Sequence, residues 1–273
     1  SGIVNIYSPI VSIDNNVCTP SVNVENSTGF FTGDKVLIIQ MQGASIDQTN
    51  TAQYGILSAY NNAGNYEFSR VTSVNGTTIF LQDTLVRSYT IAGKVQLVKV
   101  PEYQDVDVSG ALTGSPWNGS TGGVVALAAT GTMTLNAPVV ASQLGFRGAI
   151  AQNAATVPSF HVTDYVGVNT SPGYYAPKGE GVAAYGVAPL TNGKGAPANG
   201  GGGGNNHNAG GGGGANIGDG GNGGYGWQPI YTGNYQLSQG VGGHKLINQN
   251  NQIFLGGGGG AGHTNENENS SGG

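Results

Sequence analysis

The sequence predicts a mainly β protein with very little α-helix, built from an N-terminal β-barrel or sandwich, a β-roll or solenoid, and a glycine-rich region of polyglycine-II-like helices. Three observations predict it. Short apolar runs alternate with turn residues early in the chain, closely spaced β runs follow, and five-glycine runs come last. We place the boundaries at residues 1–108, 109–150 and 151–273. Since the chain closes on Ser-Ser-Gly-Gly, we expect a further glycine run beyond residue 273.

The first part reads as several short strands. Residues 36–41 (VLIIQM) and 95–100 (VQLVKV) are apolar runs, and Pro101 ends the second one. Residues 71–74 and 77–81 flank Asn75-Gly76, a pair that favours the two positive φ values of a type I′ hairpin turn. Two further stretches, 46–54 and 149–157, could form short helical turns. The spacing of the strands indicates a small barrel or sandwich.

The second part has its β runs much closer together. They cover residues 124–128, 133–135 and 139–141, and only a few residues separate one run from the next. Such spacing is typical of a β-roll or β-solenoid, in which each turn of the chain stacks on the previous one.

Glycine is concentrated in the last part of the chain, since residues 145–273 hold 37 of the 51 glycines. Its runs are Gly200–Gly204, Gly210–Gly214 and Gly256–Gly260. A flexible linker is one reading. The equal run lengths, and bulky segments such as residues 253–255 (IFL), favour a bundle of extended helices with three residues per turn. Without Cβ atoms, such helices can approach closely and bond to one another.

Composition excludes several classes of partner and chemistry. Only 8% of residues are charged and the net charge is −5, which argues against nucleic acid because phosphate binding needs a basic surface. No run of 18 apolar residues exists, so we expect no membrane insertion. The single cysteine, Cys18, rules out an internal disulfide and reads as a buried or idle thiol. Chance explains the GxGxxG matches in so glycine-rich a region, and Gly195 follows Lys194 where a Walker motif needs Ser or Thr.

Metal and catalytic signals are weak, so we expect no cofactor, no metal and no enzyme activity. The four histidines (His161, His207, His244 and His263) show no ligand spacing. Asp219 lies in a glycine-rich stretch without the paired glycines of calcium-binding repeats. Asp105 and Asp107 could share a strand face as a carboxylate pair, or simply keep an exposed edge soluble.

Aromatic residues give the main functional signal in the glycine-rich part. Tyrosine and tryptophan offer rigid, amphipathic contact area and are enriched at recognition surfaces. They are therefore our candidates for ligand contact, with a role as hydrophobic caps of the bundle as the alternative. The candidates are Tyr174, Tyr175, Tyr225, Trp227, Tyr231 and Tyr235.

Several motifs also carry a family resemblance: residues 33–44 (GDKVLIIQMQGA), 63–67 (AGNYE), 122–127 (GGVVAL) and 144–148 (LGFRG). Together they resemble the N-terminal regions of large Bacteroidota surface proteins exported by type IX secretion, which include gliding-motility adhesins. The glycine part resembles, by composition, the polyglycine-helix regions of anaplastic-lymphoma-kinase-type receptors and some phage tail adhesins. The resemblance implies O-glycosylation at Thr84, in the Asp83-Thr84-Leu85 pattern.

We therefore expect a secreted, non-enzymatic cell-surface adhesin or structural protein that presents or forms a binding surface. Its expected partners are the secretion machinery, other surface proteins and glycans. Two alternatives remain open. One is a carbohydrate-binding module of a larger polysaccharide-active enzyme, and the other is a self-assembling surface fibre subunit.

Overall fold

A computed structural model describes residues 2–153, 162–167, 174–183, 190–205, 208–226, 237–247 and 251–264. The fold is mainly β, as predicted, and the labelled elements include one short 3₁₀ turn, η1 (Ile91–Gly93). The chain forms two compact units. The first comprises Ser1–Gly43, Asn62–Gly145 and Asn251–Ile253, and the second comprises Ala44–Asn61, Phe146–Asn250 and Phe254–Gly273.

This division differs from the boundaries that we drew at residues 108 and 150. An excursion of the N-terminal part, residues 44–61, belongs to the glycine-rich unit, where the Ala44 N–H donates to the Val182 carbonyl at 3.2 Å. The excursion carries its own antiparallel pair, β5 (Ser45–Ile46) and β6 (Leu57–Ala59). Residues 46–54 therefore form a strand end and turns, in place of the helical turn that we considered. In the second helical candidate, residues 152–153 form β16, and residues 154–157 lie outside the described ranges.

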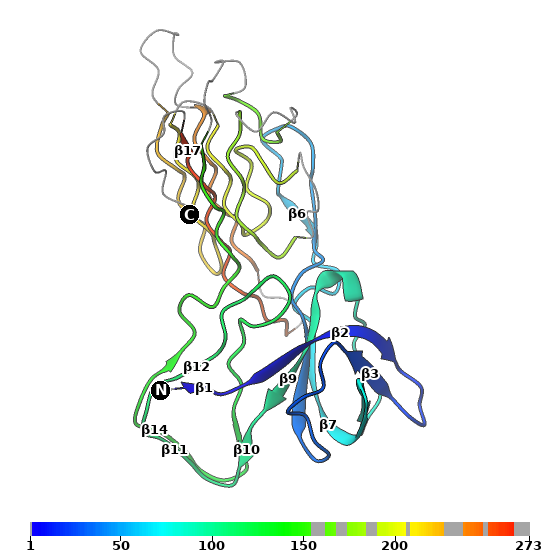
Figure 1. Cartoon of the computed structure of the whole chain (residues 1–273). Coiled ribbons are helices and arrows are strands. Elements are labelled where there is room, and N and C mark those ends of the chain that lie inside the picture. Colours follow the sequence, from blue (N-terminus) through cyan, green and yellow to red (C-terminus); the bar gives the residue numbers. More distant parts are fainter. Residues whose placement is uncertain are drawn as a thin grey trace. The chain divides into compact units, whose positions relative to one another are not determined.

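The first unit contains a closed six-stranded barrel, visible in Figure 1, so the barrel and not the sandwich is correct. Neighbouring strands pair antiparallel in the order β2-β3-β8-β7-β4-β9. The strands are β2 (Ile6–Asp14), β3 (Ser21–Val24), β4 (Lys35–Gln40), β7 (Tyr66–Asn75), β8 (Thr78–Leu81) and β9 (Val95–Val100). Closure leaves no free sheet edge on this part of the molecule.

Alternating apolar side chains fill the barrel. Val36, Ile38, Ile79 and Leu97 are completely buried, and each comes from an apolar run that predicted a strand. Period-two alternation explains this, because every second side chain on a strand points to the same face.

The predicted hairpin is present, but its turn type is different. The pair Asn75↔Thr78 closes β7 on β8, so the two loop residues are Gly76 and Thr77. Gly76 has φ +57°, whereas Asn75 is not among the residues with positive φ. Glycine with positive φ at the first loop position is the arrangement of a type II′ turn. Cys18, on an earlier loop of the barrel, is an exposed thiol.

A β-roll of two parallel coils forms the rest of the first unit. Its first coil comprises β10 (Glu102–Tyr103), β11 (Val106–Val108) and β12 (Leu112–Thr113), and its second comprises β13 (Ala128–Ala129), β14 (Met133–Leu135) and β15 (Val139–Val140). Each strand pairs with the residues that lie 26 or 27 positions further along the chain. The N-terminal strand β1 (Gly2–Ile3) pairs with β12 on its other edge. The roll therefore begins at residue 102, earlier than expected, and recruits the N-terminus.

The predicted run 124–128 is a strand only at its end, because residues 124–126 bond to side chains of the barrel. The Tyr7 hydroxyl donates to the Val124 carbonyl at 2.6 Å, and the Asn5 amide donates to the Ala126 carbonyl at 2.7 Å. Gln96, fully buried on β9, exchanges two 2.9 Å hydrogen bonds with the backbone of Gly122. Polar side chains on the outer face of the barrel thus fix the roll against it.

In the second unit the described parts of the glycine-rich chain form extended segments that lie side by side, drawn green to red in Figure 1. Two of them end in a short parallel pair, β16 (Gln152–Asn153) with β17 (His263–Thr264). The segments are residues 146–153, 174–183, 191–199, 200–205, 209–215, 220–226, 240–247 and 255–264.

Hydrogen bonding along the run 200–204 repeats every three residues. Gly201 and Gly204 donate to one neighbour, segment 255–264, at Gly258 and Ala261 (2.8 and 2.9 Å). Gly202 donates to a different neighbour at Val241, as Asn205 does at Ser238, while Gly203 donates to Gly193. A period of three with bonds only to other segments is the signature of a polyglycine-II-type helix. The flexible-linker alternative is therefore wrong for the described runs.

Close packing explains why these positions are glycine. A Cβ atom at Gly202 would lie less than 3.0 Å from backbone atoms of Lys194 and within 3.0 Å of the Val241 nitrogen. The same conflict with neighbouring backbone arises at most glycines of both other runs, such as Gly211 and Gly258, whereas a Cβ at Gly213 would make only ordinary contacts. Gly221, Gly224 and Gly256 have open space where a Cβ would stand. The glycine runs are thus packed backbone against backbone.

Within the described residues, no helix has the length and hydropathy that a membrane crossing requires.

Candidate functional site

The second unit holds a groove of about 530 Å³ between the β6 segment and the ends of two glycine-rich segments. Residues 56–60, which contain β6, form one wall of the groove. The other wall is formed by Asp219, His244, Lys245 and Ile247. Three pieces of chain that are distant in sequence thus meet here.

Local hydrogen bonds fix the polar residues of this groove. The Tyr60 hydroxyl accepts the Ile247 N–H at 2.8 Å, and the Tyr60 ring stacks on Phe254 with centroids 4.9 Å apart. Asp219 Oδ1 accepts the Lys245 N–H at 2.8 Å, which links two pieces of chain that are distant in sequence. The groove side chains are therefore held by backbone that the bundle itself orders.

The lining combines apolar and polar surface. Ile56 is 44% exposed and Ile247 is 59% exposed, so both offer aliphatic contact area. An aromatic ring, a carboxylate, an imidazole and an ammonium group lie beside them. No hydrogen-bond partner for the buried Nε2 of His244 exists among the described residues. Rings and aliphatic edges flanked by a few fixed polar groups are the usual composition of a small-molecule or glycan site.

The sequence did not identify this groove. We considered His244 and Asp219 as metal ligands, yet no cluster of three metal-binding side chains is found in the described ranges. Tyr60 was outside the glycine-rich region where we looked for aromatic contacts. Since excursion 44–61 joins the bundle only through tertiary contacts, no local sequence signal links Tyr60 to Asp219.

Of the tyrosines predicted to contact a ligand, Tyr175 lies inside the fold. It is 2% exposed, and its hydroxyl donates to Asp164 Oδ2 at 2.8 Å. Its ring is thus part of the bundle's own packing, which was the alternative reading. Tyr174 is half-buried beside it, with ring centroids 6.2 Å apart. Tyr225 is 61% exposed and remains available as a contact residue. Trp227, Tyr231 and Tyr235 lie outside the described residues.

Two buried lysines accompany Tyr175. Lys178 Nζ donates to the carbonyls of Tyr165 and Gly195 (2.5 and 2.6 Å) and lies 4.0 Å from the Tyr54 ring centroid. Burial lowers the pKa of Lys178 well below its usual value. Lys194 donates to the Leu237 carbonyl, and burial lowers its pKa too, against the opposing effect of the Asp164 carboxylate. These ammonium groups join separate segments by binding carbonyl oxygens and ring faces.

Tyr54 completes this buried cluster. Its hydroxyl donates to the Leu190 carbonyl at 3.0 Å, and burial raises its pKa above the usual value. These contacts with carbonyl oxygens and ring faces of separate segments give the cluster a structural role.

The carboxylates considered for hydrolysis connect the two coils of the roll. Asp105 Oδ1 accepts the Thr132 N–H at 2.7 Å, and Asp107 Oδ1 accepts the Asn136 side-chain amide at 2.9 Å. Each aspartate of the first coil thus bonds to the second coil. Both aspartates therefore have a structural role, which is to connect the two coils.

Thr84, the predicted glycosylation acceptor, is half-exposed on a loop between β8 and η1. The adjacent Leu85 exchanges two hydrogen bonds with the Asn15 side chain (2.7 and 2.9 Å). Glu67 accepts the N–H groups of Val86 and Arg87. The loop is therefore fixed, with the hydroxyl-bearing residue near its surface.

No protein family model matches the chain, and no curated protein matches it. Two solved structures show limited similarity. One is the Gp54 tailspike of Acinetobacter baumannii bacteriophage AP22, solved with A. baumannii capsular saccharide (15% identity, TM-score 0.26, 41% of this chain and 17% of the tailspike). The other is the tailspike gp49 of Pseudomonas phage LKA1 (17% identity, TM-score 0.24, 41% and 18%). This chain spans less than a fifth of the length of either tailspike.

Proposed function

We propose that this chain is a non-enzymatic protein of the cell surface whose glycine bundle holds a glycan-binding groove in a fixed shape. The observation that carries the proposal is the threefold hydrogen-bond pattern of run 200–204, in which successive glycines bond to different neighbours. A backbone bonded in this way is ordered, so the residues at its ends and edges are held in place. Binding by a preorganised surface loses less entropy than binding by a flexible one.

Glycan is the ligand class that best fits the groove of Tyr60, Asp219, His244, Lys245 and Ile247. Sugar rings present apolar faces that pack on aromatic and aliphatic side chains, while their hydroxyl groups bond to carboxylate, imidazole and ammonium groups. A groove of about 530 Å³ has room for a short oligosaccharide, since ligand sites commonly measure about 300–1,000 Å³.

The proposals about the cellular location and the export route rest on the sequence motifs. The resemblance to Bacteroidota surface proteins supports display outside the cell, type IX export, an adhesive role in gliding, and contacts with the secretion machinery and other surface proteins. A charged fraction of 8% accords with an extracellular surface. O-glycosylation at Thr84 belongs to the same proposal, and the intact mass of the native protein would decide it. We expect a glycan mass that disappears in Thr84→Ala and persists in Thr78→Ala.

Binding is tested on a glycan array, followed by titration calorimetry with the best ligand. Tyr60→Ala and Asp219→Asn should each lower affinity at least tenfold, whereas Phe31→Ala, at a 64% exposed aromatic residue of the first unit, serves as a matched control outside the groove. Equal affinity in all variants would reject the groove as the site. Release of reducing ends from a polysaccharide, abolished by Asp105→Asn or Asp107→Asn, would instead favour the alternative of a polysaccharide-active enzyme.

A further inference from the structure

The two coils of the roll leave strand edges unpaired at both ends. Within the described residues, β10 and β11 pair on one edge only, with β13 and β14, and the outer edges of β13, β14 and β15 pair with nothing. Stacked β coils need several neighbours to bury a continuous core. Because this roll has only two coils, its two ends are candidate interaction surfaces.

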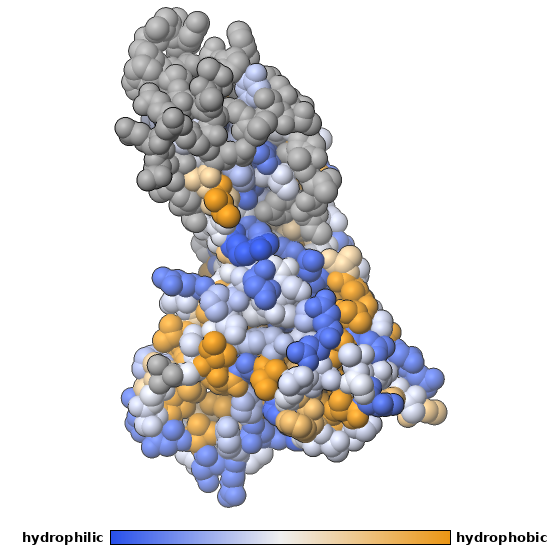
Figure 2. Space-filling model, viewed as in Figure 1, coloured by the Kyte–Doolittle hydropathy of each residue, from blue (hydrophilic) through white to orange (hydrophobic). Residues whose placement is uncertain are grey.

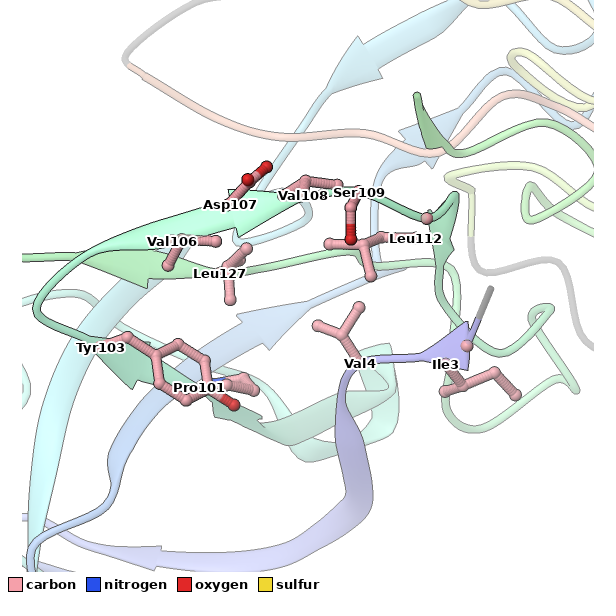
Figure 3. Close-up of a pocket in the computed structure, with 12 residues that line it drawn as sticks. Ile3, Val4, Pro101, Tyr103, Val106, Asp107, Val108, Ser109, Leu112 and Leu127 are labelled. Carbon is pink, nitrogen blue, oxygen red and sulfur yellow. The ribbon is translucent and has the colours of Figure 1, made fainter. Parts of the chain in front are cut away.

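The end at the first coil is hollow. A cavity of about 460 Å³ opens between β1, β10, β11 and β12. Figure 3 shows the side chains of Val4, Val106, Leu112 and Leu127 pointing toward one another into this space, while the Asp107 carboxylate points away. Tyr103 and Pro101 form the opposite rim. The interior of the coil is thus open at this end and lined mainly by apolar groups.

At the second coil, the side chains that correspond to those lining the hollow project from the end of the roll. Met133 and Leu135 stand beside Val106 and Val108 in the parallel register, and Val139 stands beside Leu112. They are 39%, 59% and 47% exposed. Apolar side chains that would be interior in a longer roll are therefore exposed here, beside a free strand edge. Figure 2 shows exposed apolar residues (orange) spread over the unit that contains the roll.

Charge makes the two ends different. The hollow end carries Asp105 and Asp107, whereas residues 111–146, which include the whole second coil, contain no charged residue. Natural edge strands are usually protected by charges that prevent association, and the projecting end lacks this protection. Two hollow ends in contact would leave both cavities unfilled, and two projecting ends would set Met133 and Leu135 against their own copies. A projecting end against a hollow end fills the cavity with these side chains, so the complementary arrangement is head to tail.

We infer that this surface binds a second copy of the chain, head to tail, with β14 of one copy adding to the free edge of β11 of the next. Met133 and Leu135 then enter the hollow, and the parallel pairing of the roll continues across the contact. Because β1 already pairs with β12, the contact is made over β10 and β11. An interface between two different ends is heterologous, so each copy can add a further one: the assembly is a ring if the rotation between copies closes and an open filament if it does not.

Sedimentation velocity over a range of concentrations tests the inference. The wild-type chain should form a concentration-dependent series of oligomers. Leu135→Lys blocks the projecting end and Tyr103→Lys, at a residue 56% exposed, blocks the hollow end, so each variant alone should be monomeric. Mixed together, the two should form a 1:1 dimer and nothing larger, because one intact interface remains. Val86→Lys, at a residue 92% exposed on the barrel, is the matched control and should assemble like wild type.

Near-ultraviolet circular dichroism of each variant verifies that the fold is intact. A wild-type chain that stays monomeric up to its solubility limit would overturn the inference. So would variants that still assemble, or a mixture that remains monomeric. Since glycan binding is measured at the groove of the other unit, failure here leaves the proposed function untouched.

Discussion

The barrel and the glycine bundle both have a closely packed interior, but the groups that pack there are different. The barrel buries side chains such as Ile38 and Leu97 inside a closed sheet, whereas the glycine runs of the bundle pack backbone against backbone and leave no room for a Cβ at positions such as Gly202. In the barrel the dominant favourable term is the removal of apolar surface from water. In the bundle it is backbone hydrogen bonding between segments, supported by close contacts that only glycine permits. The comparison teaches that a low-complexity composition can specify a packed core.

The largest expected effect comes from adding one methyl group inside the bundle. Gly202→Ala should destabilise the second unit by about 2–7 kcal/mol, combining overpacking of about 1–3 kcal/mol with two or three broken backbone bonds of about 0.5–1.5 kcal/mol each. Amide hydrogen exchange across residues 200–204 measures it. Gly221→Ala, where the methyl meets open space, should leave exchange nearly unchanged. Equal protection in both variants would show that the runs are not packed as described.

Removing a side chain from the barrel should cost less. Ile38 is fully buried on β4, so Ile38→Ala leaves a cavity and should destabilise the first unit by about 2–5 kcal/mol. Exchange rates of β4 and β9 amides report on this unit. At the 92% exposed Val86, Val86→Ala should stay within about 0.5 kcal/mol of wild type. A larger loss at Val86 than at Ile38 would contradict the assignment of the core.

Removing a buried polar side chain from the bundle should cost less than either of these two changes. Asn199 is fully buried; its Oδ1 accepts the Val182 N–H at 2.7 Å, and its amide donates to the Leu255 carbonyl at 3.0 Å. Asn199→Ala would leave buried backbone groups without partners and should cost about 1–3 kcal/mol. Urea titration followed by exchange in segment 255–264 measures the loss. The exposed Asn216→Ala is the control, and an equal effect there would remove the special role of Asn199.

The smallest effect is a dependence of stability on pH. The folded pKa of Lys178 lies below its unfolded value of 10.5, so the unfolded chain binds more protons between these two values. Its contribution to the free energy of unfolding therefore rises as pH increases through that window. Tyr54 acts oppositely, since its folded pKa lies above 10.0 and its contribution falls as pH rises beyond 10. Unfolding of the second unit should thus be most difficult near pH 10.

Lys178→Met sharpens this last prediction. The variant should lose much of the rise toward pH 10, while the fall above it, due to Tyr54, should persist. Urea titrations at several pH values between 7 and 11 would measure both limbs. A rise that survives in Lys178→Met would assign the effect to other groups, Lys194 first among them.

Strand positions were accessible from the sequence because they depend on local patterns. The run 95–100 became β9 with the predicted bounds, and residues 133–135 became β14. The hairpin was predicted correctly, but its two-residue turn was placed one residue early and given the wrong type, because β7 continues to Asn75 and pairs there with Thr78. The candidate site was not accessible. Its members, Tyr60, Asp219 and His244, come from segments that carry no mutual signal along the chain.

By itself the sequence determined the class of each part: alternating apolar runs require a two-faced strand, and runs of bare glycine permit backbone to approach backbone. Only the tertiary structure decided that residues 44–61 join the glycine-rich unit, that Tyr175 is buried, and that the roll has one hollow and one projecting end. The reason is physical. Local patterns fix which way a side chain can point, whereas contacts between distant segments depend on how complete surfaces fit, and that information is spread over the whole chain.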